Sequence, residues 1–143
     1  MNFITTQDRF QVSLSSLEDK ISVDNPVRFV DAFVEHLDLS KLGFIINTLK
    51  TEGRPSFDSK SFLKIYLYGY LNGLRRSRKL ERECFTNIEL RWLIGNLTPN
   101  YHSITDFRKI NPKALKNVFK LFVCFDYIDI SNCEIISLCS HKY

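Results

Sequence analysis

SFDSKSFLKIYLYGYL, residues 56–71, is the stretch that decides the fold. Apolar and aromatic side chains cover almost the full circumference of a helix here, at Phe62, Leu63, Ile65, Tyr66, Leu67, Tyr68 and Tyr70. A helix that is apolar all round is normally buried in the centre of a domain. We therefore expect the aromatic residues of this helix to fill the core, with the other helices packed around it.

The residues before this stretch predict an arm and two further helices. Residues 1–20 are polar and irregular, which is typical of an arm. A helix is predicted over residues 25–38, because Asn25-Pro26 is a helix start signal and apolar residues follow at three- and four-residue spacing. A second, short helix is predicted over residues 40–50 from the spacing of Leu42, Ile45, Ile46 and Leu49.

After Asn72-Gly73 the chain becomes basic. At 100° per residue, Arg75, Arg78, Lys79 and Arg82 fall on one side of a helix. Leu80, Cys84 and Ile88 fall on the opposite side, so we expect the basic side chains to face solvent. Asn87 is predicted to cap a second short helix, which ends at Gly95-Asn96.

Two more helices are predicted toward the C-terminus. Residues 103–106, Ser-Ile-Thr-Asp, have the form of a capping box and would open a short helix, and Asn111-Pro112 would cap another that runs to about residue 125. Residues 133–138 alone look like a strand, which has no partner here. The sequence thus predicts an all-α, compact multi-helix domain over residues 21–128, with helix-turn-helix-like elements, and an unpaired strand or tail over residues 129–143.

Composition restricts the class of protein. The 143 residues carry a net charge of +4 and contain neither a run of about 18 apolar residues nor a signal peptide, so we expect a cytoplasmic protein without membrane contact. The four cysteines are scattered, which favours reduced thiols. Cys133, Cys139 and His141 lie close in sequence but fit no zinc spacing, and we expect neither a metal nor a cofactor.

Residues 53–109 resemble the N-terminal domain of bacterial insertion-sequence transposases of the DDE type. The residues and short motifs that match the family, in chain order, are Gly53-Arg54-Pro55, Lys64, Tyr68-Gly69-Tyr70, Gly73, Arg75, Ser77-Arg78-Lys79-Leu80-Glu81, Asn87, Trp92-Leu93, Pro99, Ser103-Ile104 and Phe107-Arg108. Their order and spacing carry the resemblance, which covers about residues 10–130. Arg76 and Asn100 depart from the residues usual in the family.

The resemblance implies that the partner is DNA, at the ends of an insertion sequence. In such transposases a strand after the helical domain ends in the first catalytic aspartate, and Cys139 stands at that place here. The DDE carboxylates hold divalent cations, and a thiol is a poor ligand for Mg²⁺. The other two carboxylates would lie beyond Tyr143. We therefore expect a chain, truncated before the catalytic domain, that binds DNA and is not an enzyme.

The candidate DNA-binding residues are basic, because clustered Arg and Lys neutralise phosphates. They are Arg75, Arg76, Arg78, Lys79 and Arg82, followed in rank by Arg108 and Lys109. Glu81 is expected to pair with Arg78 or Arg82, and Arg108 and Lys109 can pair with Asp106. His36 and His102 are expected to have no catalytic role.

Three alternatives remain open. The basic cluster can be an ordinary solvated helix face. The apolar helix over residues 56–71 can dock on a partner, so that the chain pairs with itself or with full-length transposase and inhibits it. The chain can also be a decayed fragment without a function.

Overall fold

The computed structural model describes residues 6–45 and 57–128, and all regular structure in this part of the chain is helical. A short 3-10 helix, η1 (Glu18–Lys20), comes first. The α-helices follow in the order α1 (Pro26–His36), α2 (Ser59–Leu71), α3 (Ser77–Thr86), α4 (Ile88–Leu93), α5 (Tyr101–Ile110) and α6 (Pro112–Ile128). The predicted all-α class is confirmed.

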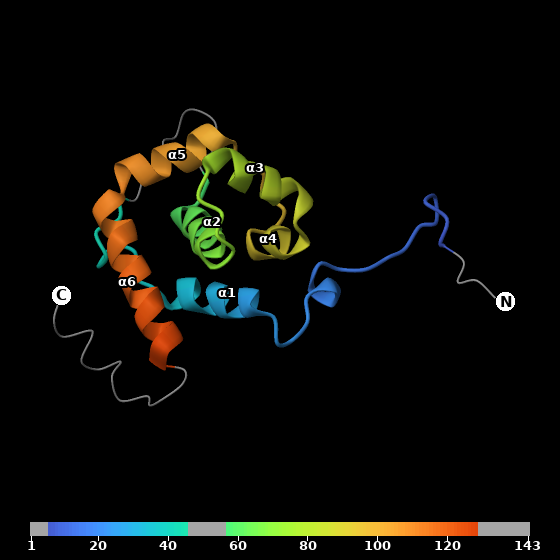
Figure 1. The fold of residues 1–143 in the computed structure, drawn as a ribbon, viewed down its shortest axis with the longest axis horizontal. Helices are drawn as coiled ribbons and strands as arrows, with labels where there is room; N and C mark the ends of the chain where they lie inside the picture. Colours follow the sequence, from blue (N-terminus) through green and yellow to red (C-terminus); the bar gives the residue numbers. More distant parts are fainter. Residues whose placement is uncertain (1–5, 46–56, 129–143) are drawn as a thin grey trace.

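Helix α2 lies in the middle of the molecule, as its apolar circumference predicts. Figure 1 shows the other helices arranged around it, with α1 below, α3 and α4 to one side, α5 above and α6 on the opposite side. Leu63, Ile65 and Leu67 are fully buried, and Phe62 and Tyr68 nearly so. Only the last residues of α2 are exposed, and Tyr70 there is 52% exposed.

Aromatic pairs join the surrounding helices to the core. Phe33 of α1 meets Phe122 of α6 edge-on, with ring centroids 5.1 Å apart. Phe62 of α2 stacks on Phe107 of α5, also at 5.1 Å. Such pairs contribute about 0.5–1.5 kcal/mol each beyond the burial of their area. They fix α5 and α6 against the helices that precede them in the chain.

Gly69 allows α3 to start directly against α2. A Cβ at this position would lie 2.7 Å from the carbonyl oxygen of Leu74 and 2.8 Å from a methyl group of Leu80. The amide of Leu74 donates a hydrogen bond of 2.7 Å to the Gly69 carbonyl. Gly73, at φ +69°, turns the chain between the two helices. Glycine is therefore required for steric reasons at the centre of the Tyr68-Gly69-Tyr70 motif in α2.

The helix predicted over residues 40–50 is wrong for residues 40–45, which form turns followed by two residues without regular structure. Gly43 has φ +82°, a left-handed conformation that ends helical structure. The amide of Phe44 donates to the carbonyl of Leu39 and closes the turn. Residues 46–50 lie outside the described residues, as does the strand predicted over residues 133–138.

Two predicted caps also differ from the structure. Helix α5 starts at Tyr101, because the side chain of Asn100 accepts a hydrogen bond from the amide of Ser103; the capping box predicted at residues 103–106 does not form. The side chain of Asn111 does not cap the helix that follows it. It is buried, and its Oδ1 accepts a hydrogen bond of 2.9 Å from the amide of Ile45, so it ties two distant segments together.

Candidate nucleic-acid interface

Helix α3 presents its basic residues to solvent and its apolar residues to the core. Leu80 and Cys84 are buried against the neighbouring helices. The basic side chains all lie on exposed residues, and we call them the α3 basic face: Arg75, Arg76, Arg78, Lys79 and Arg82. The predicted burial of Leu80 and Cys84 opposite exposed basic side chains is confirmed. The helix is shorter than predicted, because Arg75 and Arg76 precede α3 and Ile88 is the first residue of α4, where it is half-buried.

A polar network fixes the end of α3 to the core. Asn87 ends α3 and caps α4, since its Oδ1 accepts from the amides of Glu89 and Leu90. Its Nδ2 donates a hydrogen bond of 2.7 Å to the hydroxyl oxygen of Tyr68 in α2, and the Tyr68 hydroxyl donates at 3.2 Å to Glu89. Burial, with the nearby Glu89 carboxylate, raises the pKa of Tyr68 to about 12. This tyrosine therefore stays protonated and acts as a structural donor.

The α3 basic face has no acidic partner among the described residues. The ion pair expected between Glu81 and Arg78 or Arg82 does not form, as none of the salt bridges in the described chain involves α3. Arg108 and Lys109 likewise form no salt bridge with Asp106. Their charges are therefore available to an external anion.

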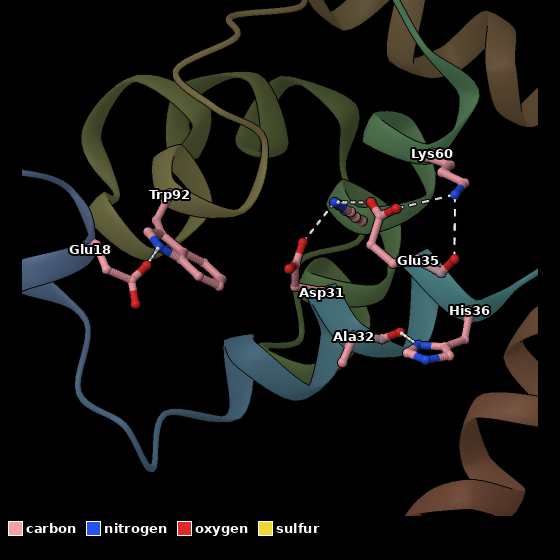
Figure 2. A network of polar contacts seen from close by, with 8 residues as sticks. Glu18, Asp31, Ala32, Glu35, His36, Lys60 and Trp92 are labelled. Atoms are coloured by element: carbon pink, nitrogen blue, oxygen red, sulfur yellow. Dashed lines mark hydrogen bonds and ion pairs between the residues drawn. The ribbon is translucent and has the colours of Figure 1, made fainter.

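The two lysines of α2 behave differently (Figure 2). Lys64 of α2 lies 2.7 Å from Asp31 and 2.8 Å from Glu35, both on α1, and Lys60 pairs with the same Glu35 at 3.2 Å. Hydrogen bonds from the two lysines hold the pKa of Glu35 below its usual value. These ion pairs hold α1 against α2, so Lys60 and Lys64 have a structural role.

The base of the N-terminal segment is also held by polar contacts. Glu18 of η1 accepts a 2.6 Å hydrogen bond from the indole nitrogen of Trp92 and lies 2.6 Å from Arg28. Arg28 in turn stacks over the Trp92 ring at 5.1 Å. Residues before η1 extend away from the helices in Figure 1. Arg28 is therefore committed to this contact and is not part of a basic surface.

The start of helix α5 lies next to the start of α3. The guanidinium of Arg78 lies 5.0 Å from the ring centroid of Tyr101, the first residue of α5, and the two helices pack together. Arg108 and Lys109 are exposed in the last turn of α5. That turn is about 10 Å further along the helix axis, beside the start of α6 (Figure 1). The structure therefore groups the five α3 residues and sets Arg108 and Lys109 apart.

Two exposed features were not predicted from the sequence. Phe85 is 61% exposed and lies on the basic side of α3, three and seven residues after Arg82 and Arg78. The lysines of α6, at Lys113, Lys116 and Lys120, are also exposed. Helical phase relative to the buried apolar residues is the signal that could have found both.

The described residues do not form a metal site. No three of their His, Cys, Asp and Glu side chains lie close enough to hold a metal ion, so the donor set for a divalent cation is not found there. Burial raises the pKa of the Cys84 thiol to about 12, which leaves it protonated and unreactive. His36 bonds to the carbonyl of Ala32 at the end of α1. Cys133, Cys139 and His141 lie outside the described residues.

Searches against known proteins give one result. The model of a family described as Transposase domain (DUF772) matches residues 15–110, which run from η1 to the end of α5. No curated protein and no solved structure matches the chain significantly. None of the helices in the described residues is long and apolar enough to cross a bilayer.

Proposed function

The chain belongs to the DUF772 transposase-domain family, and on this premise we propose that it serves transposition by binding DNA through the α3 basic face. The observation that carries the proposal is the state of the five α3 cations. They are exposed, lie on or next to one helix, and have no salt-bridge partner in the described chain. Clustered cations of this kind bind phosphates by releasing the counterions of the duplex.

The distribution of charge along the chain supports the proposal. Residues 1–74 contain 8 Lys/Arg and 9 Asp/Glu, whereas residues 75–125 contain 11 Lys/Arg and 4 Asp/Glu. The modest net charge of +4 therefore conceals a strongly basic segment over residues 75–125. A basic patch attracts an acidic polymer to one side of the molecule and steers its association.

We propose in addition that α5 is the helix offered to the major groove. Helices α3, α4 and α5 follow one another through short connections, as in a helix-turn-helix unit. His102, Asp106 and Lys109 are exposed along one side of α5 at four- and three-residue spacing. These side chains include donors and acceptors that can hydrogen-bond to base edges.

The alternative of a protein-interaction module loses its main support in the fold. That alternative needed the apolar helix over residues 56–71 to be uncovered. Helix α2 is instead enclosed by the domain, with Leu63, Ile65 and Leu67 fully buried. A partner would have to displace these core contacts before it reached the apolar side chains.

Alanine substitution of Arg75, Arg78, Lys79 and Arg82 together tests the proposal. Because phosphate contacts carry no sequence information, affinity should fall for all duplexes about equally. The slope of log affinity against log salt should fall by about 0.9 for each phosphate that is no longer neutralised. Fluorescence anisotropy with a labelled mixed-sequence duplex at several salt concentrations measures both quantities.

The control is a core variant. The α3 basic side chains are exposed, so the fourfold variant should melt within a few degrees of the wild type. Leu80→Ala should cost about 2–4 kcal/mol of stability, since Leu80 is buried, and should abolish DNA binding only on unfolding. Unchanged affinity in a folded fourfold variant would contradict the proposal.

A further inference from the structure

The exposed side of α6 carries a row of lysines. Lys113, Lys116 and Lys120 follow one another at three- and four-residue spacing, so they lie on the same side of the helix. Leu115, Val118 and Phe122, on the opposite side, are buried in the core. We call the three exposed residues the α6 lysine stripe.

No acidic residue interrupts this part of the chain. Residues 107–125 contain five basic residues and neither Asp nor Glu. Within the described residues no salt bridge involves the stripe, whereas Lys41, Lys60 and Lys64 each have a carboxylate partner. Solvated surfaces of ordinary domains intersperse charges of both signs. The α6 lysine stripe departs from that arrangement, because no acidic residue lies between its lysines.

We propose that the α6 lysine stripe is a second phosphate-binding surface for duplex DNA, separate from the α3 basic face. This inference rests on the proposed function, because it takes DNA as the partner. The stripe lies beyond residues 15–110, so the family match does not extend to it. Lys113 and Lys120 are about 10 Å apart along the helix axis, a length over which a duplex presents several phosphates.

The fold favours DNA over an anionic membrane as the partner. A helix that binds at a bilayer surface inserts its apolar side among the lipids. The apolar side of α6 is not available for this, because Leu115, Val118 and Phe122 form part of the core. Phe122 also contacts Phe33 of α1. A polyanion that needs only the lysine side chains fits the exposed surface better.

The test is the threefold variant Lys113→Gln, Lys116→Gln, Lys120→Gln, compared with a variant of equal charge change. The control variant, Arg9→Gln, Lys20→Gln, Lys41→Gln, removes three exposed cations from the N-terminal half. Binding of the labelled mixed-sequence duplex is measured between about 50 and about 200 mM salt. The stripe variant should lower the salt slope by about 0.9 per phosphate contact, so by roughly 2–3, and the control by much less.

A conservative variant separates charge from shape. The variant Lys113→Arg, Lys116→Arg, Lys120→Arg keeps the positive charges and should retain the wild-type slope. Circular dichroism melting shows whether each variant is folded. If the stripe variant binds DNA like the control while the α3 variant is weakened, this inference is overturned and the proposed function stands. If neither the stripe variant nor the α3 variant changes DNA binding, both this inference and the proposed function fail. Weaker binding to phosphatidylserine vesicles without any change in DNA affinity would also overturn it.

Discussion

Phe85 is the residue whose exposure is hardest to explain by the fold alone. It is a large aromatic side chain, 61% exposed, on the same side of α3 as Arg78 and Arg82. Single exposed apolar residues are common on protein surfaces. Its position among unpaired cations is what distinguishes it from Phe10, which is 90% exposed in the segment before η1. An apolar side chain so placed can meet thymine methyl groups or bases once the phosphates are bound.

We expect Phe85→Ala to weaken DNA binding by about five- to tenfold, which corresponds to about 1 kcal/mol of apolar contact. The salt slope should not change, because no counterion is released by an apolar contact. Titration of a labelled duplex at several salt concentrations measures both. Phe10→Ala is the matched control and should bind like the wild type. A changed slope, or an equal weakening in the control, would count against a direct contact.

At the scale of elements, ionic contacts divide the helices into two groups. Helices α1 and α2 are joined by Lys64, whose side chain is only 11% exposed, and by Lys60 through Glu35. Burial alone would lower the pKa of Lys64, but hydrogen bonds with Asp31 and Glu35 carry it above the usual value. Helices α3, α5 and α6 have no such ion pairs in the described chain. Ion pairs therefore link α1 to α2, whereas the basic side chains of α3, α5 and α6 are exposed to solvent.

Lys64→Met should lower the free energy of unfolding by about 1 kcal/mol at neutral pH, since its partners are partly exposed. The pKa of Glu35 is lowered in the folded state, so its contribution is present above about 4.5 and disappears as pH falls through the lowered value. The difference between variant and wild type should therefore shrink at about pH 3. Urea denaturation at both pH values measures it. Lys41→Met, which removes an exposed pair, should change little at either pH.

At the scale of the whole molecule, the helices form one closed arrangement around α2 (Figure 1). Exposed cations without a salt bridge in the described residues are most numerous on and beside α3, α5 and α6, which follow one another along its outer rim; Arg9, Lys20 and Arg91 also lack one. The described part of this arrangement contains no carboxylate cluster that could hold a metal ion. In the DDE-type transposases that the sequence resembles, cleavage needs carboxylate-bound divalent cations, and the resemblance implies that Cys139 takes the place of the first aspartate.

From that resemblance we propose that the chain binds DNA without cutting it. With Mg²⁺ or Mn²⁺ present, a supercoiled plasmid should remain intact at protein concentrations that fully shift a duplex in a gel. The reason is that two catalytic metals need carboxylate ligands, and a thiol is a poor ligand for Mg²⁺. Reactions with EDTA in place of the metal serve as the control, and nicking by the purified protein that requires Mg²⁺ or Mn²⁺ would contradict the prediction.

Residue spacing alone predicted most of the helices and the outward direction of the arginines. The apolar circumference of α2 and the opposition of Leu80 and Cys84 to Arg78 and Arg82 follow from 100° of rotation per residue, which is a local property. The Asn87 cap is also local, because its side chain bonds to amides two and three residues away. Local geometry does not depend on the rest of the chain, and these features were accordingly readable from the sequence.

Only the tertiary structure decided which surfaces meet and which charges stay unpaired. The sequence predicts Asn111 to be a helix cap, but its side chain accepts a hydrogen bond from the amide of Ile45, a residue 66 positions away in sequence. Lys64 pairs with Asp31 and Glu35 of α1, whereas Glu81 forms no ion pair in the described chain. Both outcomes depend on side-chain positions that residue spacing does not fix. Long-range contacts are chosen by the packing of the whole core around α2, and that choice leaves the cations of α3 and α6 facing solvent.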